Sequence, residues 1–469
     1  MESRSKYLIK NVGILTVSNF ASKILVFLLV PLYTSVLSTE EVGVFDLIVS
    51  TVSLLVPILS LNIVDAVMRF TMDRAKSKDE IAAIGVKFIG ISSFIAIIIV
   101  IICRNLPQFN VINGLEILII LYYVSYIMNS FLIQFSKGME KVADLGIAGV
   151  VGTAFTIAAN ILFLLVMKWG LPGFLLANVL GQAIPALYLF IRIQLWRFLR
   201  SFSINKELQK EMLLYCVPLI ATTVGWWVNS ASDKYVVAFM CGVGANGLLS
   251  VAYKIPQVIN TLHGIFTQAW QISAIKEYDS KDSTKFYGRS FLILNVLLAA
   301  ACAWLIVLSK PVGRILYQKD FYAAWQYVPF LLISCVLNSA SGFCGSILSA
   351  KKDSKSMAMS AVYGAGVNVV LNITFVYLIG IQGATIATVI SSFIIYYVRK
   401  KAVGDAIEID GYGRVLITWA LLCAQALVEI YLPYWWLEVI LMAIMLIINI
   451  NTIKDLLSFG TSMIRKKGE

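Results

Sequence analysis

The sequence predicts an all-α membrane protein with about fourteen membrane-spanning helices. Of its 469 residues, 59% are hydrophobic and 14% are charged, whereas about a quarter of the residues in soluble domains are charged. The apolar residues form continuous runs such as 89–103 and 435–450, and a helix needs about 20 apolar residues to cross a membrane. Strands of a membrane barrel would instead alternate in polarity over about 10 residues.

Charged residues between the apolar runs set the limits of the expected helices. The expected spans cover residues 8–37, 42–70, 81–103, 112–136, 143–168, 172–199, 212–241, 246–275, 286–309, 323–350, 356–380, 382–399, 415–432 and 434–452. No expected connection is long enough to fold into a soluble catalytic domain. The N-terminal residues lack a short apolar core with a small-residue cleavage site, so no removable signal peptide is expected.

Positive charge is unevenly divided between alternate connections. One set carries two or more Lys or Arg residues in each connection, whereas the opposite set holds only Arg104, Lys168, Lys310, Arg314 and Lys319. Because Lys and Arg concentrate on the cytoplasmic side, we expect both termini in the cytoplasm and a multi-pass protein of the cell membrane. The net charge of +12 is then mainly a topology signal, with membrane lipids as secondary partners and no nucleic acid.

The sequence predicts no cofactor and no metal site. It contains one histidine, its seven cysteines form no CxxC pair, and it has no GxxxxGK[ST] loop for ATP. We therefore expect the cysteines to be small buried hydrophobic residues.

Segments of the first half recur in the second half. Residues 147–163 match 359–375, residues 170–180 match 380–390 after a slip of two, and residues 39–48 match 243–252. The matched residues are Gly152 with Gly364, Asn160 with Asn372, Gly170 with Gly380, Gly173 with Gly383, Ala177 with Ala387, and Gly43 with Gly247. A repeat of about six spans predicts two pseudo-symmetric lobes in the same orientation, as in transporters that rock around a central site. The predicted divisions are 1–205 and 206–402 for the lobes and 403–469 for two additional helices and a cytoplasmic tail.

Charged residues inside the expected spans indicate a wet cavity, because a charge at a helix centre costs roughly 2.5–3.5 kcal/mol. They concentrate in the first two spans of each half: Lys23, Asp46, Asp65, Arg69, Asp233, Lys234, Lys254 and His263. Polar side chains extend these positions along helix faces. The faces comprise Asp46, Ser50, Ser53, Pro57 and Ser60; Thr222, Trp226, Asn229 and Asp233; and Lys254, Gln257, Thr261, Gly264, Gln268 and Gln271. We expect these faces to line one central cavity.

Other interpretations of these charges stay open. Asp46 and Asp233 lie near the outer ends of their spans, where interfacial water is within reach. Arg69 lies at a cytoplasmic end and is alternatively a topology charge or a snorkelling side chain. Lys234 is alternatively the partner of a neighbouring carboxylate, and His263 is either a packing residue or a group that titrates.

Lysines and aromatic residues in these spans favour an anionic, sugar-bearing ligand. Lys23, Lys234 and Lys254 are compact point charges suited to phosphate. Trp226 and Trp270 offer flat amphipathic surfaces on which sugars stack, although interfacial belts also use tryptophan.

Residues 226–282 resemble the polysaccharide-biosynthesis exporters, which are flippases for lipid-linked O-antigen, capsule and related repeat units. Residues 28–47, with a Pro-Leu turn and a Glu-x-Gly-x-Phe segment, resemble the first hairpin of that family, and residues 349–391 resemble its C-terminal half. The resemblance implies the fold of the multidrug/oligosaccharidyl-lipid/polysaccharide exporter (MOP) superfamily, with two lobes alternately open to each side. Fourteen spans are similar to the lipid II flippases, in which two extra helices form a groove for the lipid tail.

The resulting hypothesis is a flippase and not an enzyme. It would move a polyprenyl-diphosphate-linked oligosaccharide to the outer leaflet for cell-surface polysaccharide synthesis. The predicted substrate-binding residues are Lys23, Arg69, Trp226, Asn229, Lys234, Lys254, Gln257, Gln268 and Trp270, and the candidates for coupling to a proton or sodium gradient are Asp46, Asp65, Asp233 and His263. Polymerases and other envelope-glycan machinery are further expected partners.

Besides a scaffold role without transport, three alternatives remain. A multidrug/cation antiporter of the same superfamily would use carboxylates and aromatic residues, and not three deep lysines, to bind cations. A lipid II-type flippase would differ only in its substrate. A membrane polymerase or ligase would usually carry a large external loop, which this sequence lacks.

Overall fold

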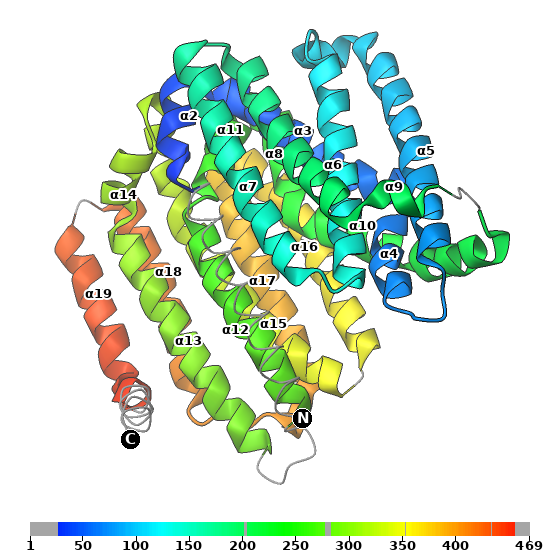
Figure 1. Cartoon of the computed structure of the whole chain (residues 1–469). Helices are drawn as coiled ribbons and strands as arrows, with labels where there is room; N and C mark the ends of the chain where they lie inside the picture. Colours follow the sequence, from blue (N-terminus) through cyan, green and yellow to red (C-terminus); the bar gives the residue numbers. More distant parts are fainter. Residues whose placement is uncertain (1–26, 201–203, 277–282, 352, 433, 455–469) are drawn as a thin grey trace, which may run out of the picture. The chain divides into compact units, whose positions relative to one another are not determined.

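The computed structural model describes residues 27–200, 204–276, 283–351, 353–432 and 434–454 (Figure 1). Within these ranges all regular structure is helical. Eleven of the described helices are long and apolar enough to cross a membrane, and shorter apolar helices accompany them. The predicted all-α membrane fold with about fourteen spans is therefore confirmed.

Packing divides the chain into two compact units, Met1–Ala231 and Ser232–Glu469. The first unit contains α2 (Val30–Val36), α3 (Thr39–Leu59), α4 (Ile63–Thr71), α5 (Lys78–Arg104), α6 (Glu116–Gly138), α7 (Val142–Asn160) with a π-helical continuation (Ile161–Val166), α8 (Gly170–Ile193) and α9 (Leu195–Phe198). Helix α10 (Lys206–Cys241) runs across the division. The predicted domain boundaries after residues 205 and 402 stay predictions.

The second unit contains the remaining helices, which continue the predicted order of spans. They are α11 (Val243–Ala252), α12 (Pro256–Lys276), α13 (Ser283–Val307), α14 (Ser309–Leu316), a 3₁₀ helix η3 (Lys319–Tyr327), α15 (Val328–Ala350), α16 (Ser354–Ile379), α17 (Ile381–Val403), α18 (Tyr412–Tyr431) and α19 (Trp435–Ile448). Short 3₁₀ helices, Pro107–Ile112 and Gly404–Ala406, complete the two units.

Two predicted spans that carry candidate site residues are each broken into two helices. Span 42–70 divides into α3 and α4 because Leu61 and Asn62 adopt left-handed conformations, with φ angles of 51° and 55°, and such residues do not continue a helix. Span 246–275 divides into α11 and α12 before Pro256, because proline disfavours helical geometry in the residue that precedes it. The second break leaves Tyr253 and Lys254 in a turn.

The predicted repeat has structural counterparts within the two units. Gly170 and Gly380 stand at the starts of α8 and α17, and both have positive φ angles, 59° and 63°. Asn160 of α7 and Asn372 of α16 are both buried. Gly170 follows Asn160 by ten positions, whereas Gly380 follows Asn372 by eight, so the longer connection of the first unit accounts for the two-residue slip. It contains the π-helical segment Ile161–Val166.

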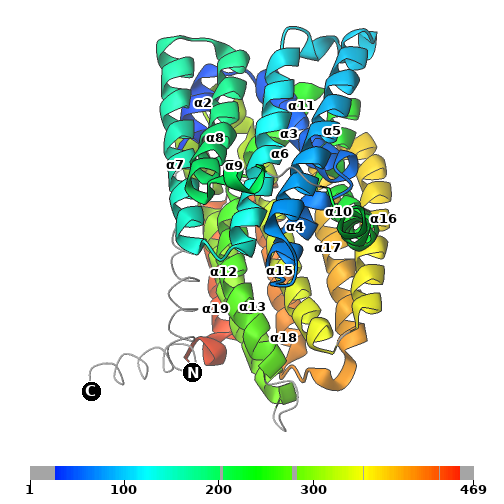
Figure 2. The same cartoon turned by 45° about the vertical axis from the view of Figure 1, so that its right-hand side comes forward.

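The matched glycines also occupy equivalent helix contacts. A methyl group at Gly152 of α7 would lie 3.0 Å from the Pro185 ring of α8, and one at Gly364 of α16 would overlap Ile395 of α17. Both views show α7 beside α8 and α16 beside α17 (Figures 1 and 2). Small residues allow such close approach of membrane helices, so these positions support the pseudo-symmetry of the two lobes.

The Glu-x-Gly-x-Phe segment holds two helix starts together. The Ser38 hydroxyl accepts a hydrogen bond from the Glu41 backbone amide at 3.2 Å. The Glu41 carboxylate in turn accepts one from the Ser38 backbone amide at 2.8 Å, and the two bonds form a capping box for α3. The second carboxylate oxygen of Glu41 accepts the amide of Leu171 in the first turn of α8 at 3.2 Å. Phe45 packs on Phe174 of α8, with ring centroids 4.4 Å apart. This segment therefore has a structural role in joining α3 to α8.

The two additional helices, α18 and α19, pack against α13 of the second unit (Figure 1). The Trp419 indole of α18 donates to the Asn295 side chain of α13 at 2.8 Å, and the Gln425 amide donates to the Ala303 carbonyl at 3.1 Å. Hydrogen bonds from buried side chains of α18 thus attach this helix to α13.

We predict that Gly383→Ala destabilises the protein. A methyl group there would overlap the backbone of Phe375, where α16 and α17 cross, and such overpacking costs about 1–3 kcal/mol. The control is Gly366→Ala in α16, where a methyl group meets no atom within 4 Å. Thermal unfolding of the purified variants should show a lower midpoint for Gly383→Ala alone, and equal midpoints would contradict the close helix contact.

Candidate functional site

The predicted site residues fall in both compact units. Lys23 lies outside the described residues. On α3, Asp46 is half-buried. On α4, Asp65 and Arg69 are both exposed, and Asp65 accepts hydrogen bonds from Asn62 at 3.0 Å and from Gln134 of α6 at 3.4 Å. Asp65 is thus held in place beside the break between α3 and α4.

The first part of α10 brings a tryptophan onto α3. The Trp227 indole donates to the Ser50 carbonyl at 2.9 Å. The neighbouring Trp226 is 54% exposed, and Asn229 is half-buried. Of the two adjacent tryptophans, Trp226 is therefore exposed, and Trp227 attaches α10 to α3.

Asp233 is the most buried of the predicted charges on α10, with 4% of its surface exposed. The Tyr253 hydroxyl donates to one of its carboxylate oxygens, and the Lys234 amide donates to the other at 2.9 Å. Tyr253 reaches Asp233 from the turn between α11 and α12. The carboxylate therefore accepts a hydrogen bond from a neutral hydroxyl in the turn between α11 and α12. Helical spacing along α10 did not predict this partner.

Two of the predicted lysines lie close in sequence to this contact. Lys234 follows Asp233 on α10, and Lys254 follows Tyr253 in the turn; both are half-buried. Lys254 does not continue the face of α12, because the break before Pro256 separates it from that helix. Gln257 is exposed on the first turn of α12, and the side chain of Gln268 lies outside the described residues. The Asp233–Tyr253 hydrogen bond thus ties α10 to the turn that bears Lys254.

His263 and Trp270 lie on α12 among packed neighbours. The His263 ring makes a 3.0 Å hydrogen bond with the Thr267 hydroxyl and approaches Gly342 of α15, where a methyl group would lie 3.2 Å from it. The Trp270 ring is 5% exposed and stacks on Phe343 with centroids 4.1 Å apart. In this structure both side chains contribute to the packing of α12 against α15.

A buried amide and hydroxyl network extends from α10 to α16 and α17. The Ser232 hydroxyl and the Asn372 amide both donate to the Asn368 side-chain oxygen, at 3.1 Å and 2.8 Å. The Asn368 amide donates to Ser391 of α17 at 3.0 Å. None of these residues is among the candidate site residues that the sequence predicts. The spacing of Asn368 and Asn372, which places both on one face of an apolar helix, was the available signal.

Arg399 of α17 is a buried cation that is not among the predicted site residues. It is 5% exposed, and its guanidinium donates to the Ser360 hydroxyl at 3.0 Å and to the Ser341 carbonyl at 3.2 Å. These contacts join α15, α16 and α17 at one end.

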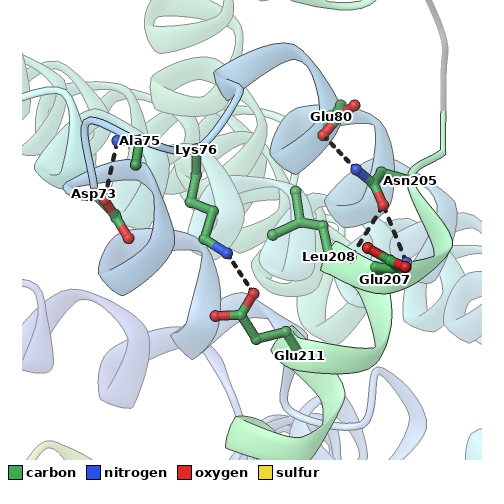
Figure 3. A network of polar contacts seen from close by, with 8 residues as sticks. All are labelled: Asp73, Ala75, Lys76, Glu80, Asn205, Glu207, Leu208 and Glu211. Carbon is green, nitrogen blue, oxygen red and sulfur yellow. Dashed lines mark hydrogen bonds and ion pairs between the residues drawn. The ribbon is translucent and has the colours of Figure 1, made fainter.

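The start of α10 is anchored to the turn between α4 and α5 by polar contacts (Figure 3). Lys76 in that turn forms an ion pair with Glu211, and the hydrogen bond to Glu211 raises the pKa of Lys76 above its ordinary value. The Asn205 side-chain oxygen caps α10 by accepting a hydrogen bond from the Leu208 backbone amide at 3.2 Å. The Asn205 side-chain amide donates a hydrogen bond to Glu80 of α5 at 3.3 Å. The helix that carries Asn229 is therefore tied to its own unit at its first turn.

A family model described as polysaccharide biosynthesis protein matches residues 8–271 of the chain. The multidrug and toxin extrusion protein 1 of Mus musculus is 22% identical over 212 residues. That match covers 43% of this chain and 37% of the mouse protein, so the chain aligns with little more than a third of that relative.

Solved structures with the same fold cover most of the chain. A lipid II flippase, MurJ, in an inward closed conformation has a TM-score of 0.67 at 15% identity and covers 94% of this chain and 99% of that one. An inward-facing multidrug resistance MATE family transporter of the MOP superfamily has a TM-score of 0.66 at 14% identity, with coverages of 83% and 95%. These likenesses show that the chain has the MOP superfamily fold.

We predict that Tyr253→Phe destabilises the protein by about 1–3 kcal/mol, because it removes a donor from the buried Asp233 carboxylate. The matched control is Tyr377→Phe, the same change at an exposed position of α16. Thermal unfolding should show a lower midpoint for Tyr253→Phe only. Similar midpoints for the two variants would mean that the hydroxyl does not hold Asp233.

We predict that Glu211→Lys weakens the anchoring of α10 and that adding Lys76→Glu restores it, because the double variant re-forms the ion pair with reversed charges. Both side chains are partly exposed, so the effect should be small and should disappear at high salt. Thermal unfolding at low and high ionic strength measures this. A double variant no more stable than Glu211→Lys would contradict a specific pairing.

Proposed function

Because the chain belongs to the polysaccharide biosynthesis protein family, we propose that it is a flippase for a polyprenyl-diphosphate-linked oligosaccharide. The substrate would pass from the cytoplasmic to the outer leaflet of the cell membrane and serve the synthesis of a cell-surface polysaccharide such as a capsule or an O-antigen. The family match, which covers more than half of the chain, is the observation that carries this proposal. The fold shared with a lipid II flippase supports it.

The chemical problem of this reaction is to move a charged diphosphate and a hydrophilic glycan past hydrocarbon while no covalent bond changes. Lys23, Lys234 and Lys254 would replace water around the diphosphate, since an ammonium group binds phosphate as a point charge. Arg69 would add a further positive charge. Lys234 and Lys254 are both half-buried, so neither residue is sealed inside the protein, which supports this role.

The glycan would be held by side-chain amides and aromatic surfaces. Asn229, Gln257 and Gln268 would exchange hydrogen bonds with sugar hydroxyls. The open ring of Trp226 is suited to stacking on a sugar. Trp270 would reach a sugar only if its stacking on Phe343 were to change.

Alternating access requires a source of energy, and we propose a proton or sodium gradient. The candidates for the coupling group are Asp46, Asp65, Asp233 and His263. Asp233 is the best supported of them, because its carboxylate is buried and its Tyr253 partner stands in a helix break. Protonation or sodium binding at Asp233 would change that hydrogen bond and so act on the turn that carries Lys254.

The orientation follows from the division of positive charge between the connections. We propose that both termini face the cytoplasm, where the lipid-linked oligosaccharide is made. The polymerase and other envelope-glycan machinery would receive the substrate on the opposite side.

The second candidate function is a multidrug or cation antiporter, which the likeness to the mouse extrusion protein and the MATE fold favours. The lysines at the proposed site are less suited to a cationic substrate. The structure of the lipid-linked oligosaccharide that accumulates in a deletion strain would name the substrate. Drug sensitivity with an unchanged envelope glycan would instead support the antiporter.

We predict that the double variant Lys23→Ala with Lys254→Ala abolishes most export of the glycan, because it removes two of the three lysines proposed to bind the diphosphate. The control is Lys351→Ala, at an exposed turn residue after α15. Complementation of the deletion strain, measured as surface polysaccharide at equal protein abundance, provides the test. Export at the wild-type level in the double variant would overturn the proposed cationic site.

A further inference from the structure

A buried charged cluster lies where α14, α18 and α19 meet in the second unit, and the flippase proposal does not use it. Glu429 stands near the end of α18 and is 2% exposed. The Ser309 hydroxyl donates to one of its carboxylate oxygens at 2.8 Å, and the Lys310 ammonium pairs with the other at 3.3 Å. Lys310 also donates to the Glu429 carbonyl at 2.8 Å. Each carboxylate oxygen of Glu429 thus has a donor inside the protein, and Lys310 is its counter-ion.

The cluster contains a second buried carboxyl group. Glu438 in the first turn of α19 is also 2% exposed, and its carboxyl group lies within hydrogen-bonding reach of the Glu429 carboxyl group. Its other oxygen, Oε2, has no hydrogen-bond partner among the described residues. Two carboxyl groups can form a hydrogen bond only if one of them carries a proton.

The count of charges leads to the same conclusion. The charged groups that act on Glu438 are Glu429 of α18 and Lys310 of α14. Helix α13, which also packs against α19, carries Lys285 and Arg289 in its first two turns, far along the helix from this end. The η3 residues that bear charge, Lys319 and Asp320, are exposed, and it is the uncharged Trp325 of η3 that lies against Lys310, 4.6 Å from its ammonium group.

Two ionised carboxylates facing one ammonium group would leave one negative charge buried without compensation. Burial of an unpaired carboxylate is strongly unfavourable, and two carboxylates in contact do not both ionise readily. One proton on Glu438, donated toward Glu429, makes the group of three side chains neutral and satisfies the contact between the two acids.

We propose that Glu438 and Glu429 form a proton-binding site that holds one shared proton at neutral pH and fastens α18 and α19 to α14. All its members lie at one end of their helices, beside the α18–α19 connection and the start of α14. That end carries Lys310 and Arg314, which belong to the lysine-poor set of connections, so the positive-inside rule places it on the outer side. The proton would therefore exchange with the external medium, and this proposal does not depend on which substrate the protein moves.

Infrared spectroscopy of the full-length protein in lipid nanodiscs tests the site. The wild type should show the C=O stretch of a protonated carboxyl group at neutral pH, with a shift in D₂O. This band should be lost in Glu438→Gln, whose amide imitates the protonated acid as a hydrogen-bond donor. The matched control, Glu408→Gln, changes an exposed acid of the same unit and should keep the band.

Thermal unfolding provides a second, independent readout. The midpoint of the wild type should fall as the pH rises from neutral, when the shared proton is lost, whereas the midpoint of Glu438→Gln should stay level over the same range. Absence of the protonated-carboxyl band in the wild type, or its persistence in Glu438→Gln, would overturn the proposal. Loss of the wild-type band on addition of sodium at constant pH would also overturn it, because the site would then bind sodium in place of a proton.

Discussion

Hydrocarbon provides no hydrogen bonds, so each polar group of a membrane-spanning chain needs a partner inside the protein or access to water. This constraint explains the internal contacts of the chain. Asp233 is held by the hydroxyl of Tyr253, Arg399 by a hydroxyl and a carbonyl group, and Glu429 by Ser309 and Lys310. In each case these partners come from another helix or from a turn between helices, so the buried polar groups also decide which segments stay together.

The general architecture could be predicted from the sequence because it depends on properties of single segments. Apolar length determines how many helices cross the membrane, and the matched glycines predicted the repeat. Their close helix contacts became visible only in the structure. The slip of two residues between Asn160 and Gly170 has a local cause, a longer connection with a π-helical turn. Periodicity carries no information on such changes in winding, which depend on the packing around them.

The site was predicted less completely because its contacts join different helices. Helical spacing placed Lys254 on one face with Gln257, but the break before Pro256 removes Lys254 from that helix. Arg399 begins the basic run 399–401 at the end of an expected span, where positive charge indicates the cytoplasmic side, whereas in the structure it is buried. The Tyr253–Asp233 contact depends on the same break, since a tyrosine in a continuous helix would point elsewhere. Pro256, two residues after Lys254, is the signal that would have corrected the assignment of Lys254.

Helix α10 has a consequence for how the protein is made. By sequence it begins the second repeat, yet its residues up to Ala231 pack with the first unit. At about 1.5 Å per residue, its 36 residues are much longer than the hydrocarbon core requires. During synthesis the first unit is therefore complete only after the first helix of the second repeat has been made. A chain cut after residue 205 would separate the first unit from residues 206–231, which pack with it. Those residues would then remain attached to the second half.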